Sequence, residues 1–211
     1  GTEMYSFAMN IGGLFKLLHR DIYAKYPETN QFAFENEIWF AWGKLIKINI
    51  AKSCPFAQGM IYEDVENTPK SFLMANKVVF SLDGRYNYRI RTDSIMGENK
   101  NIPKKDIAKV IDMDCEFISA ANISEIDKDK MYKHLFKQLA YNYNLAVKSN
   151  SEIADEVCKR IEEVFYKNKT LWKNSKCISI QRKLGYWLIS GHAVLYKKGY
   201  RLYSVRKKNN E

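Results

Sequence analysis

The spacing of hydrophobic residues predicts helices in the N-terminal part of the chain. In residues 4–26, apolar side chains recur at intervals of three and four, and Pro27 ends the segment. We therefore expect a helix there. Residues 34–53 form a second apolar segment, and its first half suits a helix. Its second half, from Leu45 to Ile50, alternates between apolar and polar residues and suits a strand equally well.

The central part of the chain predicts a loop followed by a β-hairpin. Residues 54–70 hold two prolines, a glycine and mixed polar residues, which is typical of a loop. Two runs rich in β-forming residues then flank Asp83-Gly84. Because this dipeptide suits the tight turn between antiparallel strands, the pattern predicts a hairpin.

Two amphipathic helices are predicted next. Ser124 and Asp127 are spaced as in a capping box, and apolar residues recur every four positions through residues 124–148. A further helix is expected to begin at residues 149–152 and to extend to about residue 167. In that segment, apolar residues again recur at helical intervals, with pairs of opposite charge four residues apart on the outer side.

From Cys177 onward the apolar pattern changes to a period of two. Four short runs, CISIQR, YWLIS, AVLY and YRLYSV, are separated by glycine-containing segments. This predicts an antiparallel β-meander over residues 167–211. The expected fold class is therefore α+β, with N-terminal helices, a central β-hairpin, two amphipathic helices and the C-terminal meander. We expect a single domain over residues 1–211, in which residues 1–53 could form an N-terminal helical subdomain.

Positive charge is concentrated at the C-terminal end of the chain. The net charge is +10, yet residues 1–60 carry six cations and five acids, and residues 61–166 carry 16 cations and 18 acids. Residues 167–211 carry twelve cations and one acid, Glu211. Such segregation indicates a polyanionic partner, and solubility alone would require far less of it.

Aromatic residues alternate with the cations of this basic segment. Lysine and arginine neutralise phosphates, and exposed rings stack on bases, so single-stranded nucleic acid is the partner that suits the mixture best. The same rings would also serve to pack the sheet against the two helices. Binding of DNA or RNA with low sequence specificity is the leading prediction. The expected binding residues are Lys183, Trp187, Lys197, Lys198, Tyr200, Arg201, Tyr203, Arg206, Lys207 and Lys208.

Three carboxylates alternate along residues 107–118 and form the main candidate for catalysis. In a strand, Asp112, Asp114 and Glu116 would share one face, about 6.6 Å apart. Clustered carboxylates of this kind hold Mg²⁺ or Mn²⁺ in phosphoryl-transfer sites. An ordinary solvent-exposed strand face explains the pattern too, and a helix also fits the apolar residues. No cofactor is otherwise indicated.

The acid pair and a downstream histidine resemble two motifs of a known family. Asp112 and Asp114 stand in an apolar context, and His192 follows Ser190-Gly191 between two apolar runs. This arrangement resembles the first two motifs of archaeo-eukaryotic primases. The resemblance implies that the two aspartates hold metal and that His192 contacts nucleotide phosphate. The family's later acidic motif has no counterpart, since only Glu211 lies beyond His192. A metal-dependent nuclease or a primase-like nucleotidyl transferase using these residues and Glu116 is the enzymatic alternative.

A third hypothesis is an assembly module of a larger complex. It would use the N-terminal helix with Trp39 and Trp42 as a protein interface and the basic face as a docking surface, for which an acidic protein or an anionic membrane is a possible partner. The four cysteines form no CxxC pair, so we expect reduced thiols and a cytoplasmic location. No run reaches the roughly 18 apolar residues that cross a bilayer.

Overall fold

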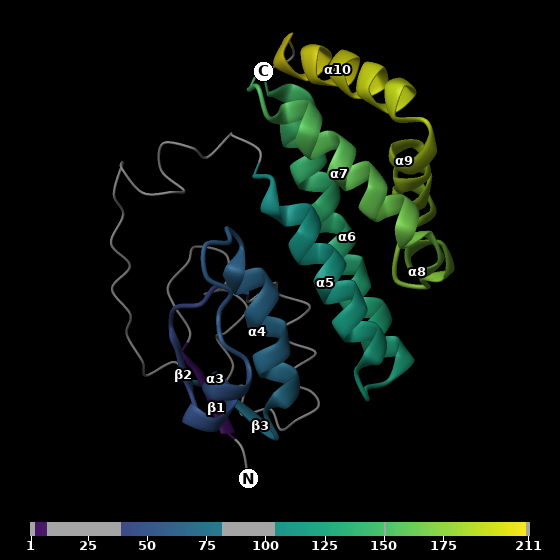
Figure 1. Cartoon of the computed structure of the whole chain (residues 1–211). Coiled ribbons are helices and arrows are strands. Elements are labelled where there is room, and N and C mark those ends of the chain that lie inside the picture. Colours follow the sequence, from purple (N-terminus) through teal and green to yellow (C-terminus); the bar gives the residue numbers. More distant parts are fainter. Residues whose placement is uncertain (1–2, 8–38, 82–103, 150, 210–211) are drawn as a thin grey trace. The chain divides into compact units, whose positions relative to one another are not determined.

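The structure is a computed structural model that describes residues 3–7, 39–81, 104–149 and 151–209. The chain forms two compact units, Gly1–Arg91 and Thr92–Glu211, and each is described by itself (Figure 1). The described residues are mostly helical. The expected α+β fold with a C-terminal meander is therefore wrong. Within the described residues, no helix is both long enough and apolar enough to cross a membrane.

The first unit contains a small sheet with the strand order β2-β1-β3. Strand β1 (Glu3–Phe7) pairs antiparallel with β2 (Lys44–Ile46) and parallel with β3 (Lys77–Ser81). The helix expected over residues 4–26 is thus a strand at its beginning, and its remainder lies outside the described residues. The turn at Asp83-Gly84 and the second strand of the predicted hairpin also lie outside them.

The helix-or-strand alternative left open for Leu45 to Ile50 is resolved as the end of a strand and the start of a short helix. In the first half of the segment, where a helix was expected, residues 34–38 lie outside the described residues. Residues 39–43 form no helix, β2 follows, and α3 (Ile48–Ser53) ends the segment. Ile50 is buried, whereas Ile48 is 64% exposed. The segment before α3 therefore differs from the helix that its apolar residues favoured.

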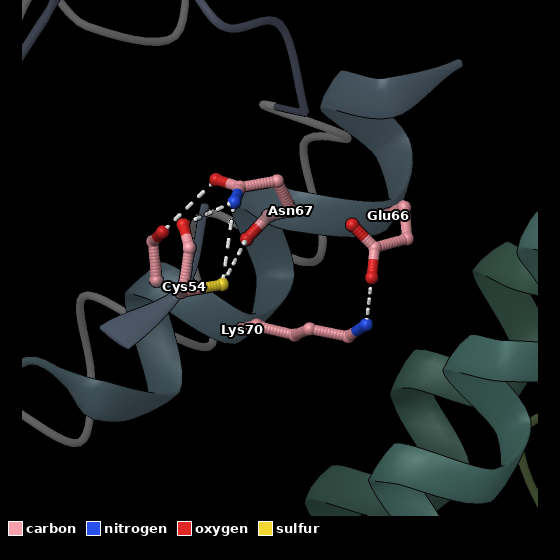
Figure 2. Close-up of polar contacts among 5 residues, drawn as sticks. Cys54, Glu66, Asn67 and Lys70 are labelled. Carbon is pink, nitrogen blue, oxygen red and sulfur yellow. Dashed lines mark hydrogen bonds and ion pairs between the residues drawn. The ribbon is translucent and has the colours of Figure 1, made fainter. Parts of the chain in front are cut away.

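Helix α4 (Glu63–Met74) begins within residues 54–70, which were predicted to be a loop. That prediction is wrong from Glu63 onward, whereas residues 54–62 form neither helix nor strand. Its first turn is acidic, which suits the positive end of the helix dipole, and Pro69 is tolerated inside it. Its polar residues are buried because they bind one another. Asn67 donates to the Cys54 carbonyl oxygen (2.6 Å) and accepts from the Ser71 hydroxyl (3.1 Å), and Glu66 pairs with Lys70 (Figure 2). The two prolines, the glycine and the polar residues of residues 54–70 are the features that made this segment look like a loop.

The second unit is built on three helices that lie side by side, α5 (Asp106–Ala120), α6 (Glu125–Lys148) and α7 (Ala154–Lys167) (Figure 1). The predictions of α6 and α7 are confirmed. Ser124 caps α6 as expected, because its hydroxyl oxygen accepts from the Asp127 backbone N–H at 3.1 Å. Residues 107–118 belong to α5, so the helix is the correct one of the alternatives considered for them.

The predicted C-terminal meander is replaced by helices α8 (Lys169–Asn174), α9 (Ile180–Gly191) and α10 (Ala193–Asn209). Runs of four to six residues with alternating polarity also fit a helix, so the period of two was not diagnostic. Gly185 and Gly199, which were interpreted as parts of turns, lie inside helices. Ser179 is the N-cap of α9, since its hydroxyl oxygen accepts from the Arg182 backbone N–H at 3.4 Å.

A cluster of buried rings fixes α9 against α6 and α7. The ring centroid of Phe165 lies 5.8 Å from that of Phe136 and 4.8 Å from that of Tyr186. The Trp172 ring meets Tyr186 edge-on at 6.0 Å. Phe136 and Phe165 are completely buried, and each such side chain stabilises the fold by about 2–3 kcal/mol. This cluster determines which side of α9 points inward.

Candidate functional site

The three candidate carboxylates do not converge, because they lie on a helix. Asp112 and Glu116 are one turn apart on α5 and both accept from the Lys167 ammonium, at 2.7 and 2.8 Å. Asn168 also donates to Asp112, at 3.1 Å. Asp114 lies between them in sequence, on another side of the helix, and is only 1% exposed. The three carboxylates therefore have two roles. Asp114 is a buried acid, whereas Asp112 and Glu116 form ion pairs with Lys167 that connect α5 to the end of α7.

This arrangement differs from the one a metal site requires. Hydrogen bonds to Asp112 and Glu116 raise the pKa of Lys167, so its ammonium stays charged between the two acids. Across the described residues, no group of three His, Cys, Asp or Glu side chains is placed to hold a metal ion. His192 follows the end of α9, with its ring 4.3 Å from that of Trp187. The pocket lined by His192 shares no residue with the pocket lined by Glu116.

The nine cations of the basic segment whose side chains the structure describes fall into two groups. The first group has partners within the fold and includes Lys167, which binds Asp112 and Glu116. Lys197 pairs with Glu162 at 3.0 Å, and Lys183 donates to the Ser175 carbonyl oxygen at 2.5 Å, so these two predicted binding residues have structural partners. The other group is exposed and forms no ion pair with any described residue. Its members are Lys169, Lys173, Lys176, Arg182, Lys198 and Arg201.

The predicted aromatic binding residues also differ in exposure. Trp187 is 49% exposed and Tyr203 is 63% exposed. Tyr200 is half-buried, and its ring lies beside those of Tyr196 and Tyr203 on the same helix, with centroids 6.0 and 6.4 Å away. The Lys148 ammonium of α6 lies 5.2 Å from the Tyr200 ring centroid, so Tyr200 also contacts a neighbouring helix. The last three predicted residues, Arg206, Lys207 and Lys208, lie in α10, and their side chains are outside the described part of the chain.

An apolar groove of about 600 Å³ lies between α8 and α9. On α9, Ile180, Leu184 and Trp187 recur at intervals of four and three and form one exposed stripe. Tyr166 at the end of α7 and two lysines of α8 also line the groove. We call this the α8–α9 groove. It is lined by Tyr166, Lys169, Thr170, Trp172, Lys173, Ile180, Lys183, Leu184, Trp187, Ser190 and Gly191.

Most of the groove's lining residues were not among the predicted binding residues. Ile180 and Leu184 were absent because their segment was interpreted as strands, and Tyr166, in the predicted helix before that segment, was not among them either. The available signal was the spacing of Ile180, Leu184 and Trp187, which fits a helix face and is incompatible with one face of a strand. Only Trp187 and Lys183 of the predicted residues line the groove.

Hydrogen bonds hold the segment that connects α8 to α9. The Asp129 carboxylate on α6 accepts from the backbone N–H groups of Lys176 and Cys177, at 2.7 and 3.1 Å. The Ser175 hydroxyl accepts from the Ile178 N–H at 3.0 Å. On α8, the Trp172 indole donates to the Phe165 carbonyl oxygen at 2.8 Å. The two walls of the groove are therefore positioned before any ligand binds.

The first unit contains one lysine with an unusual environment. The Lys44 ammonium donates to the Phe40 carbonyl oxygen and lies 4.0 Å from the Phe40 ring centroid. Burial lowers the pKa of Lys44 to about 7, although Asp64 opposes this shift. Burial also raises the pKa of the Asp64 carboxyl. Trp39, predicted as part of a protein interface, is buried, whereas Trp42 is half-buried and stacks on Phe40 at 3.9 Å.

Comparisons with protein-family models, with curated proteins and with solved structures found no match to this chain.

Proposed function

We propose that this protein binds nucleic acid with little sequence specificity through the basic surface of α8, α9 and α10. The observation that carries the proposal is the group of six exposed cations that form no ion pair with any described residue. They belong to a segment with twelve cations and one acid. Charges that stabilised the fold would have intramolecular partners, as Lys167 and Lys197 do.

Phosphate neutralisation is the chemistry that suits this surface. Each lysine or arginine that contacts a phosphate releases a condensed counterion, so affinity depends steeply on salt. On α10, Lys198 and Arg201 are exposed and three residues apart, which places them on the same side of the helix. Cations on a surface contact the backbone of any sequence, because base recognition needs side chains that reach base edges. Low sequence specificity follows from this.

The decisive experiment is fluorescence-polarisation binding to a labelled single-stranded oligonucleotide at about 50 and 200 mM salt. We expect binding that weakens steeply at the higher salt. The double variant Lys198→Glu, Arg201→Glu should bind at least about tenfold more weakly, and the salt dependence should fall by about two phosphate contacts.

The double variant Lys109→Glu, Lys159→Glu is the matched control for charge. Lys109 and Lys159 are exposed on α5 and α7, outside the basic segment, and their reversal should leave affinity nearly unchanged. Equal losses in both variants would mean that only net charge matters. No binding at low salt would contradict the proposal outright.

An acidic protein is the second candidate partner, and a separate observation favours it. Val194, Leu195 and Leu202 on α10 are 66, 63 and 68% exposed. Phosphate binding does not explain the exposure of these apolar side chains. Apolar residues beside cations are typical of protein interfaces with acidic partners. Size-exclusion chromatography of a mixture with an acidic polypeptide such as polyglutamate tests this alternative directly.

A further inference from the structure

Four exposed apolar side chains line the α8–α9 groove. Ile180 is 85% exposed, Tyr166 is 61% exposed, Leu184 is 56% exposed and Trp187 is 49% exposed. Single exposed apolar residues are common on protein surfaces, but these four line one groove of about 600 Å³. Exposed apolar residues that gather in one groove are typical of ligand-binding grooves, whereas isolated ones need no explanation.

The edge of the groove is positive. Lys169 and Lys173 are one turn apart on α8, both are exposed, and neither forms an ion pair with a described residue. The Lys169 ammonium lies 5.0 Å from the Tyr166 ring centroid. The lining contains no aspartate or glutamate. A ligand that fits this groove therefore carries negative charge next to an apolar surface.

The shape of the walls favours flat apolar groups. The Trp187 and Tyr166 side chains are 49 and 61% exposed, and they contact the His192 ring and the Lys169 ammonium, respectively. Rings of this size stack well on other planar groups. Buried Tyr186 and Ile189 hold α9 against the unit, so the Trp187 backbone position is fixed. A ligand with planar groups linked by anions fits these walls and the positive edge. A nucleic-acid strand with unpaired bases has this composition.

We propose that the α8–α9 groove binds unpaired bases of single-stranded nucleic acid, stacked on Trp187 and Tyr166, with adjacent phosphates on Lys169 and Lys173. This inference rests on the proposed function and adds its substrate class. Bases in a duplex are stacked on one another and present only their edges, so they cannot enter the groove. The groove thus gives the basic surface a preference for single strands over duplexes.

The test compares Trp187→Ala with the wild-type protein on three probes of about 20 nucleotides, longer than the roughly 4–16 nucleotides that a small single-strand-binding domain covers. The probes are an oligothymidine strand, an abasic strand with the same number of phosphates, and a duplex. We expect a loss of about 5- to 150-fold on oligothymidine, which corresponds to about 1–3 kcal/mol for base stacking. Affinity for the abasic strand and the duplex should stay unchanged.

Two further variants guard against misfolding. Trp187→Phe keeps a ring that can stack and should recover most of the affinity for oligothymidine. Tyr141→Ala removes an equally exposed ring (58%) from α6, outside the groove, and should have no effect. Circular dichroism spectra that match the wild type would establish that each variant is folded.

The outcomes separate the two proposals. If wild-type protein binds none of the probes, both the nucleic-acid function and the groove assignment fail. If it binds all three equally and Trp187→Ala changes nothing, the basic surface binds phosphates and the groove assignment alone is wrong. An equal loss on the abasic strand would also overturn the groove assignment, because no base is present to stack.

Discussion

Two pairs of consecutive aromatic residues show how differently the inner and outer sides of α7 and α9 are used. Phe165 is fully buried and Tyr186 is 3% exposed, whereas their neighbours Tyr166 and Trp187 are 61 and 49% exposed. One step along a helix rotates a side chain by about 100°, which is enough to move it from the core to the surface. Aromatic content therefore does not identify a binding surface, but the rotation of each helix does.

Lys167 and Lys169, at the junction of α7 and α8, also differ in their contacts. Lys167 binds Asp112 and Glu116, while Lys169, two residues later, lies over the Tyr166 ring and forms no ion pair with a described residue. The first lysine stabilises the packing of α5 and α7. The second remains available to a ligand.

The comparison of rings is tested most strongly by Phe165→Ala and Tyr166→Ala. We expect Phe165→Ala to lower the free energy of unfolding by about 3–5 kcal/mol, because it leaves a cavity beside Phe136 and Tyr186. Tyr166→Ala should change it by no more than about 0.5 kcal/mol and should instead weaken oligothymidine binding. Urea denaturation measures the free energy of unfolding of both variants. Similar destabilisation by the two variants would show that the inner and outer sides are not distinct.

A smaller effect is expected from Tyr186→Phe at alkaline pH. Burial raises the pKa of Tyr186 to about 12, above the value of about 10 in an unfolded chain. The unfolded chain therefore loses this proton first, and the wild type loses stability as pH rises from about 10 toward 12. By pH 11 the variant should have gained about 1 kcal/mol relative to the wild type, compared with neutral pH. Urea denaturation at pH 8 and pH 11 checks this, and parallel changes in the two proteins would contradict it.

The smallest effects should separate the two lysine environments. Asp112→Asn removes a charge that binds Lys167, so the melting temperature should fall slightly while nucleic-acid affinity stays the same. Lys169→Gln should do the reverse, lowering the salt dependence of binding by about one phosphate contact without changing the melting temperature. Adding Mg²⁺ should not alter the melting temperature of either protein. A rise with Mg²⁺ in the wild type that Asp112→Asn abolishes would revive the metal-site hypothesis.

Parts of the fold and of the candidate site followed from local pattern. Helices α6 and α7 were predicted because their apolar repeats are long and because Ser124 gives a clear start. The meander was wrong because each of its runs was too short to distinguish a period of two from a helical one. Helix α4 was missed because Asn67, Ser71 and Cys54 satisfy one another only once the chain has folded.

The sequence by itself determined where the positive charge lies, since the excess of cations in residues 167–211 is present in any fold. It also supplied the aromatic residues beside those cations. Only the tertiary structure decided that Asp112 and Glu116 bind a lysine more than fifty positions away, and that Trp187 faces outward while Tyr186 faces the core. The physical reason is that charge is a property of the residues, whereas exposure and pairing depend on helix rotation and on contacts between distant segments.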